Sequence, residues 1–180
     1  VGVGRAAATF CVAHLCPNRI ETATLLAGDE NQRRRVVVSM SALPGRISFL
    51  AQQLSYLQHQ TLLPDTVYAA IPYFSLRERK AYVIPRDLQD AEERGRGVIL
   101  RSLVDWGPAT KLIPVLSVET SPQTIIVTLD DDIKYPSTLL EDLVDGAERH
   151  PSAAVGFRGY RLPPPRNNNK NESEGDWYYS

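Results

Sequence analysis

The sequence predicts an α/β fold built on a mostly parallel sheet, and two observations support this. From residue 36 onward, short apolar runs rich in β-branched residues alternate with stretches whose apolar residues recur at helical spacing. One run, residues 124–129 (TIIVTL), shows no polar alternation, as is typical of a strand buried on both faces. Alternation of this kind is the sequence pattern of βαβ units.

Composition limits the classes of protein that fit this chain. Its 180 residues suit one domain, which at this size buries about 70% of its unfolded surface. Apolar residues make up 43% and charged residues 23%, as in ordinary globular proteins, so disorder throughout is excluded. Twenty basic residues against 21 acidic ones give a net charge of −1, which argues against a nucleic-acid partner.

Residues 1–34 show no sustained period, and we expect a loosely structured N-terminal lead or a stem. Cys11 and Cys16 lack the second Cys or His pair that a zinc site needs. The apolar stretch 6–16 is shorter than the roughly 20 residues of a membrane span, so we expect no span in this chain. Residue 1 is Val, which leaves two expectations for localisation: cytoplasmic, or lumenal (Golgi) if an anchor precedes it.

The first half of the domain contains alternating strand and helix patterns. A helix is expected where apolar residues recur at i, i+3, i+4, i+7 and i+10, from Ile47 to Leu57. In chain order we predict a strand at 36–38, that helix at 47–57, a strand at 67–71 ended by Pro72, a polar surface helix at 87–94 and a strand at 98–100.

The second half begins with a helix at Pro108, which Pro114 should shorten or kink. Residues 124–129 should form a central strand. Thr138 and Glu141 have the spacing of a capping box at the start of an amphipathic helix over 139–147, and a further strand is expected at 153–157. From residue 163 the composition changes to Pro and Asn runs, which indicates a flexible tail.

Three adjacent carboxylates, Asp130, Asp131 and Asp132, directly follow the central strand. They repel one another, so we expect a cation to compensate them. In open α/β sheets ligands bind at the carboxyl ends of the strands, where this triplet falls. Oxygen ligands without a nearby histidine suit Mg²⁺ or Mn²⁺, which would stabilise a departing nucleoside diphosphate. The alternative is a solvated acidic loop before a helix.

A second candidate element is the segment 105–111 (DWGPATK), where a Gly hinge leads into a helix start. Backbone N–H groups at such a start attract anions, and Lys111 adds a full charge, so a diphosphate fits there. Asp105 could accept hydrogen bonds from a nucleobase or ribose. The alternative is an ordinary helix entry with Trp106 packed over it.

A third candidate group follows the first strand. Ser39, Ser41 and Arg46 occupy the position at which a nucleotide-binding α/β domain usually meets its nucleotide.

Five segments together resemble the GT-A glycosyltransferases, in particular family-2-like enzymes and the N-terminal glycosyltransferase domain of a large chlorovirus protein. The segments are 37–39 (VVS), 44–46 (PGR), 105–112 (DWGPATKL), 128–133 (TLDDDI) and 135–136 (YP). The resemblance covers residues 35–162. It implies a three-layer α/β/α sandwich with a nucleotide-sugar-binding domain over that range, and residues 163–180 as a tail or the start of an acceptor-binding part, whose C-terminal half would be truncated.

What the resemblance implies about function is a sugar transfer from a nucleoside-diphosphate sugar, a UDP-sugar, to a carbohydrate or other hydroxyl acceptor, with inversion and with Mn²⁺ or Mg²⁺. Asp132 and Asp130 would hold the metal, and Asp130 or Asp131 would lie near the ribose. Lys111 would lie near the diphosphate, Asp105 near the base or ribose, and Ser39, Ser41 and Arg46 around the nucleotide.

The general base is not assignable from the sequence, because the acceptor half that carries it in this family would follow residue 162. Glu172, Glu174 and Asp176 are candidates by chemistry only. Two alternatives for the whole chain stay open: a nucleotidyltransferase on a similar sheet, which would need a Gly-rich basic loop after the first strand, and a non-catalytic nucleotide-sugar-binding module.

Overall fold

The computed structural model describes residues 11–12 and 33–157. Its elements in chain order are β1 (Cys11–Val12), β2 (Val36–Ser41), the 3₁₀ helix η1 (Pro44–Arg46), α1 (Phe49–Leu57), β3 (Thr66–Pro72), β4 (Phe74–Ser75), β5 (Lys80–Ala81), α2 (Arg86–Glu93), β6 (Val98–Ser102), the 3₁₀ helix η2 (Gly107–Lys111), α3 (Ile113–Leu116), β7 (Ile125–Asp130), α4 (Leu139–Arg149) and β8 (Ala154–Val155). No helix in these ranges is long and apolar enough to cross a membrane.

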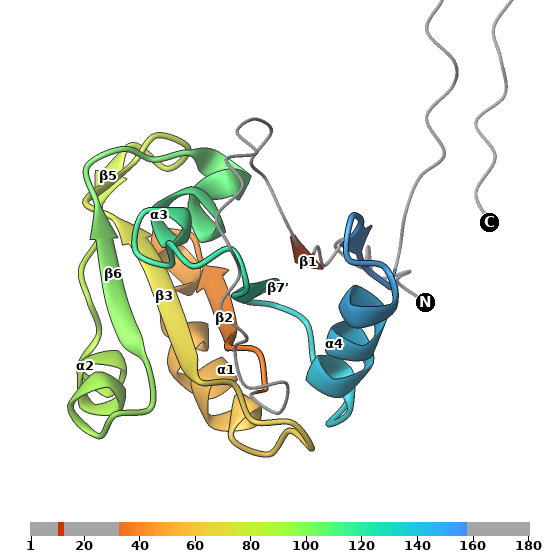
Figure 1. Cartoon of the computed structure of the whole chain (residues 1–180). Helices are drawn as coiled ribbons and strands as arrows, with labels where there is room; N and C mark the ends of the chain where they lie inside the picture. The colour runs from red at the N-terminus through yellow and green to blue at the C-terminus, as the bar shows by residue number, and fades with distance from the viewer. Residues whose placement is uncertain (1–10, 13–32, 158–180) are drawn as a thin grey trace, which may run out of the picture.

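The main sheet has the strand order β6-β3-β2-β7-β1-β8 (Figure 1). Four adjacent strands, β6, β3, β2 and β7, run parallel, and β1 pairs antiparallel with both β7 and β8. The predicted α/β class with a mostly parallel sheet is therefore confirmed. β7 lies in the interior of the sheet, as its unbroken apolar run predicts, and Ile125 to Leu129 are all buried.

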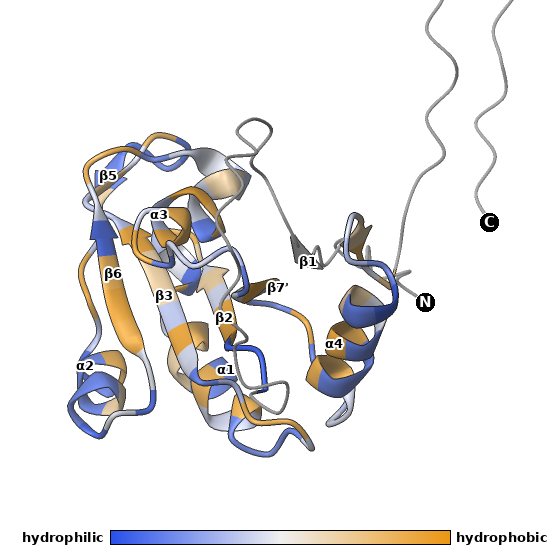
Figure 2. Ribbon diagram, viewed as in Figure 1, coloured by the Kyte–Doolittle hydropathy of each residue, from blue (hydrophilic) through white to orange (hydrophobic). Residues whose placement is uncertain are grey.

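Helices cover both faces of the sheet. Apolar residues of α1, α2 and α4 pack on one face, where they form the larger core with Val38, Met40 and Leu129. On the other face Val115 of α3 packs with Val37, Tyr68 and Ile126. Figure 1 shows α3 in front of the sheet and α1 behind it, and in Figure 2 the apolar residues of α4 line its inner side.

Strand order creates a switch point between β2 and β7. From β2 the chain proceeds to β3 and then β6 on one side, and β7 is added on the opposite side of β2. Ser41 and Asp130 are register partners at the carboxyl ends of these two strands. Ligands of open α/β sheets bind in the crevice at such a point.

Four local predictions need correction or refinement. The capping box at Thr138 and Glu141 is wrong: the Thr138 hydroxyl donates to Asp142 (3.0 Å), and Glu141 accepts from Thr61 (2.7 Å). The N–H of Leu140 donates instead to Gln60 Oε1 (3.2 Å), so a distant amide caps α4.

The predicted helix after Pro108 is broken, as expected, but the break lies at Leu112, between η2 and α3, and Pro114 sits in the first turn of α3. The strand expected at 153–157 forms only over β8. Within the expected N-terminal lead, Cys11–Val12 joins the sheet as β1, while residues 1–10, 13–32 and 158–180 lie outside the described part of the chain.

Candidate functional site

The acidic triplet lies at the switch point, where its carboxylates pair with cations from two different elements. Asp130 is the last residue of β7 and its side chain pairs with Lys111 of η2. Arg46 of η1 bridges the other two, with Nη2 3.0 Å from Asp131 Oδ1 and Nη1 2.6 Å from Asp132 Oδ2. Two cations from different elements therefore partly neutralise three carboxylates.

The backbone of the triplet is held in place by side chains from elsewhere. Gln53 of α1 is buried, and its Nε2 donates to the carbonyls of Asp131 (3.2 Å) and Ile133 (2.9 Å). The N–H of Asp130 donates to the Tyr135 hydroxyl (2.9 Å). The loop after β7 is thus fixed by specific hydrogen bonds to α1.

Arg46 and Lys111 supply part of the cationic compensation that we expected for the triplet. Within residues 11–12 and 33–157, no group of three or more His, Cys, Asp or Glu side chains is placed to hold a metal by itself.

Several buried polar atoms at the switch point nevertheless lack a hydrogen-bond partner among the described residues: Oδ2 of Asp130, Oδ2 of Asp131, Oγ of Ser39 and Nε of Arg46. Asp131 is only 5% exposed, and burial raises the pKa of its carboxyl, an effect that Arg46 opposes and Asp132 reinforces. A buried acceptor without a partner costs about 1–3 kcal/mol. Such atoms gather where a polar ligand could satisfy them.

The segment 105–111 uses its polar groups mainly on itself. Gly107 has a φ of 58°, which fits the predicted Gly hinge. Asp105 Oδ1 accepts from the N–H of Gly107 and Oδ2 from the N–H of Leu76, both at 2.8 Å, while the N–H of Trp106 donates to Thr110. Asp105 therefore ties this loop to the chain after β4.

These internal bonds leave Lys111 Nζ as the main group of the segment that can meet an anion. The Lys111 side chain is 17% exposed. Trp106, which the alternative interpretation packed over the helix entry, is half-exposed.

Of the two serines, only Ser41 lies beside Asp130 in the sheet. Ser39 is fully buried and pairs in register with Thr128, and Ser41 pairs with Asp130. The structure thus brings Arg46 and Lys111 to the triplet and Ser41 to Asp130, while Ser39 is buried two residues earlier in β2. Asp105 bonds instead to Gly107 and Leu76. Glu172, Glu174 and Asp176 lie outside the described residues.

Sequence reasoning missed Gln53 and Glu78. Gln53 lies three residues after Leu50 on the buried face of α1, so the helical period could have identified it. Glu78 accepts from the N–H of Gly45 (3.2 Å) and pairs with Lys80 (2.8 Å), which links the β4–β5 turn to η1. No local pattern marks this contact, because it joins residues 33 positions apart.

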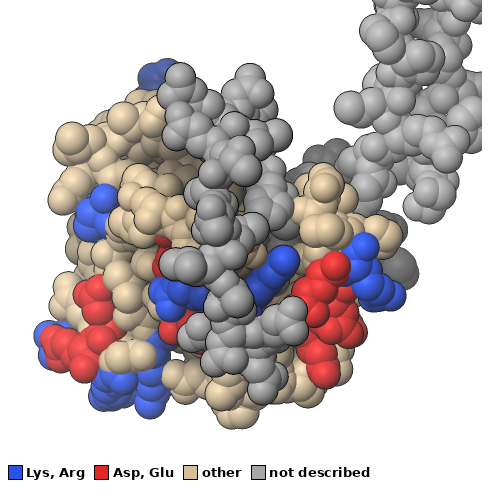
Figure 3. All heavy atoms as spheres, in the orientation of Figure 1, with Lys and Arg blue, Asp and Glu red and all other residues tan. Residues whose placement is uncertain are grey.

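The triplet does not line either of two surface hollows. One hollow, of about 400 Å³, lies between α2 and β6, next to Glu92 and Arg101. The other, of about 470 Å³, lies near the amino ends of β3 and β6, next to Leu57 and Val98. On the described part of the face in Figure 3, acidic and basic side chains are interspersed, so that part presents no extended field of one sign.

The fold and the site together define an open α/β domain with a charged, incompletely satisfied group at its topological switch point. No protein-family model, curated protein or solved structure matches this chain.

Proposed function

We propose that this chain is the nucleotide-sugar-binding part of a metal-dependent GT-A glycosyltransferase that transfers a sugar from a UDP-sugar to a hydroxyl acceptor. One observation carries the proposal. The acidic triplet lies at the carboxyl end of β7, at the switch point, with Lys111 beside it and buried carboxylate oxygens that lack partners in the described chain.

Strand order also supports a nucleotide ligand. Numbered along the chain, the four parallel strands stand in the order third, second, first, fourth. Doubly wound nucleotide-binding domains share this order, and their ligand lies between the first and fourth strands. Here those strands are β2, which carries Ser39 and Ser41, and β7, which ends at Asp130.

The donor groups of the triplet fit a hard divalent cation. Mg²⁺ is commonly held by one or two carboxylates together with substrate phosphates and water, so a three-residue cluster is not required. Asp132 and Asp130 are the proposed ligands, and Asp132 must first leave Arg46. When bound, the metal would act as a Lewis acid on the departing diphosphate.

The chain's own residues take distinct roles in this proposal. Lys111 would neutralise a phosphate oxygen, and Ser39 and Ser41 would supply hydroxyls beneath the nucleotide. Arg46, released from Asp132, would be free to bind the second phosphate. Asp105 fits a base or ribose contact least well, because both its oxygens already accept backbone N–H groups.

The test is calorimetric titration with a panel of nucleotide sugars, with and without Mn²⁺. We expect binding that requires metal and is lost in Asp132→Asn. Asp145→Asn, an exposed aspartate on α4, is the control and should bind as wild type does. Affinity that is unchanged in EDTA would overturn the proposal. Release of pyrophosphate would indicate a nucleotidyltransferase, and tight binding without transfer to any acceptor a binding module.

A further inference from the structure

Exposed apolar side chains gather at the edge of the sheet formed by the carboxyl ends of β3 and β6. They belong to two segments and form what we call the apolar rim: Tyr73, Phe74, Leu76, Leu103, Val104 and Trp106. Leu103 is 88% exposed and Leu76 66%. Single exposed apolar residues are ordinary, but a contiguous group indicates an interaction surface.

Contacts between the two segments hold them side by side. The N–H of Tyr73 donates to the carbonyl of Ser102 (3.0 Å), and the N–H of Leu76 donates to Asp105 (2.8 Å). The Arg101 guanidinium lies 4.3 Å from the centre of the Tyr73 ring. In Figure 2 the loops near β5 combine apolar and polar colours at the top of the molecule.

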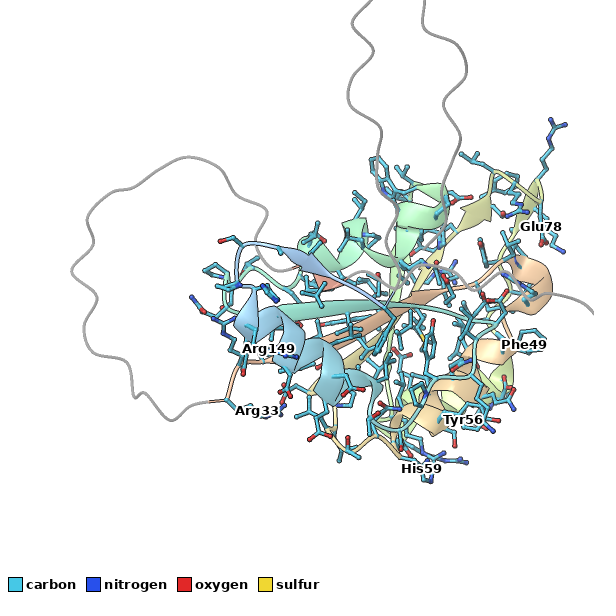
Figure 4. The ribbon with its side chains drawn as sticks, turned by 90° about the vertical axis from the view of Figure 1, so that its right-hand side faces the viewer. Arg33, Phe49, Tyr56, His59, Glu78 and Arg149 are labelled. Atoms are coloured by element: carbon cyan, nitrogen blue, oxygen red, sulfur yellow. The ribbon has the colours of Figure 1, made fainter. Side chains whose placement is uncertain are left out.

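Basic residues flank the rim. Arg77, Arg79 and Lys80 follow Leu76 directly, and only Lys80 has an ion pair in the described structure, with Glu78. Arg79 adopts a φ of 52° at the tip of the β4–β5 turn. Figure 4 shows Glu78 of this turn at the opposite end of the molecule from Arg33 and Arg149.

We propose that the apolar rim and the Arg77–Lys80 turn dock on an anionic membrane surface. Isolated aliphatic side chains at loop tips can enter the acyl boundary, aromatic residues favour the headgroup level, and the cations face lipid phosphates. Docking would then place the switch point near acceptors carried at the membrane surface, a step that rests on the proposed function.

The test is co-sedimentation with vesicles of phosphatidylcholine alone or mixed with phosphatidylserine, without metal or nucleotide, so its outcome does not depend on the proposed activity. Wild type should bind the mixed vesicles and release at high salt. Arg77→Gln/Arg79→Gln should bind about 25-fold more weakly, at roughly fivefold per cation. Leu76→Ser/Leu103→Ser should lose about tenfold or more.

Matched controls lie at the opposite edge of the sheet. Leu63→Ser and Arg94→Gln/Arg96→Gln remove exposed side chains there and should bind as wild type does. Equal binding to both vesicle types, no binding, or rim variants that match these controls would overturn the proposal. A wild-type dimer that Leu76→Ser/Leu103→Ser dissociates would assign the rim to a second copy of the chain and also overturn it.

Discussion

Arg46 and Asp131 form an ion pair, 3.0 Å from Nη2 to Oδ1, that joins η1 to the loop after β7 across the switch point. Asp131 is almost fully buried, whereas the Arg46 side chain is 40% exposed. The same guanidinium holds Asp132 through its other terminal nitrogen. A metal bound to Asp132 would therefore have to displace Arg46, which makes Arg46 a competing cation within the site.

Replacing Arg46 should lower the stability of the fold but strengthen metal binding. Arg46→Gln leaves Asp131 buried without its partner, which should lower the free energy of unfolding by roughly 1–2 kcal/mol, less than for a fully buried pair because Arg46 is partly solvated. If the proposed metal site is correct, Mn²⁺ should bind roughly tenfold more tightly, because about 1.4 kcal/mol of competing ion pairing is gone. Urea unfolding and calorimetry measure the two effects. Weaker Mn²⁺ binding would contradict the competition.

Gln53 should be important for stability and its neighbour Gln52 should not. Gln53→Ala leaves the carbonyls of Asp131 and Ile133 without their shared donor, so we expect a loss of about 1–3 kcal/mol in urea unfolding. Gln52 is exposed on the same helix, and Gln52→Ala should change stability by less than about 0.5 kcal/mol. Equal effects of the two substitutions would show that these hydrogen bonds contribute little.

The buried carboxyl of Asp131 should make stability fall with rising pH. Its pKa is raised by burial, so the folded state retains a proton that the unfolded state has released. Stability should therefore decline as pH rises from about 4, the ordinary aspartate value, through the raised pKa. Asp131→Asn lacks this group and should gain stability relative to wild type as pH rises. A constant difference between the two proteins from pH 4 to 8 would contradict the raised pKa.

Glu119 should have the opposite pH dependence. Hydrogen bonds from Arg35, at 2.8 and 3.0 Å, and from the Tyr68 hydroxyl, at 2.7 Å, lower its pKa. The stability that Glu119 contributes is present at pH values above about 4.3, the ordinary pKa of glutamate, and is lost as the pH falls below that value. Glu119→Gln should cost about 1–2 kcal/mol at neutral pH and progressively less in acid. Asp90→Asn, which breaks the exposed pair with Arg86, is the control and should cost under about 0.5 kcal/mol.

Gly107 should be intolerant of a side chain for conformational reasons alone. A Cβ at this position would meet no atom within 4 Å, yet φ is 58°, in the left-handed region. Gly107→Ala should therefore cost about 1–2 kcal/mol, and Gly107→Asn less, because Asn adopts this region more readily. Thermal unfolding of both variants distinguishes backbone strain from steric conflict, which would penalise Asn more than Ala.

Much of the site could be predicted from the sequence because its residues follow recognisable strands. Ser39, Ser41 and Asp130 end runs whose burial is readable from their apolar composition, and parallel strands place their carboxyl ends at one edge. The internal use of Asp105 could not be predicted, since its partner Leu76 is 29 positions away. The capping box failed for the same reason: Gln60, 80 positions from Leu140, displaced a local signal.

The sequence by itself determined the alternation of strands and helices, the interior place of β7 and the position of the acidic triplet after it, because side-chain periodicity and burial are local properties of the chain. Only the tertiary structure decided the strand order, the addition of β1 to the sheet, and the pairing of the triplet with Arg46, which is 86 positions from Asp132. Contacts at such separations depend on how the packed layers bring distant elements together, and no local pattern encodes them.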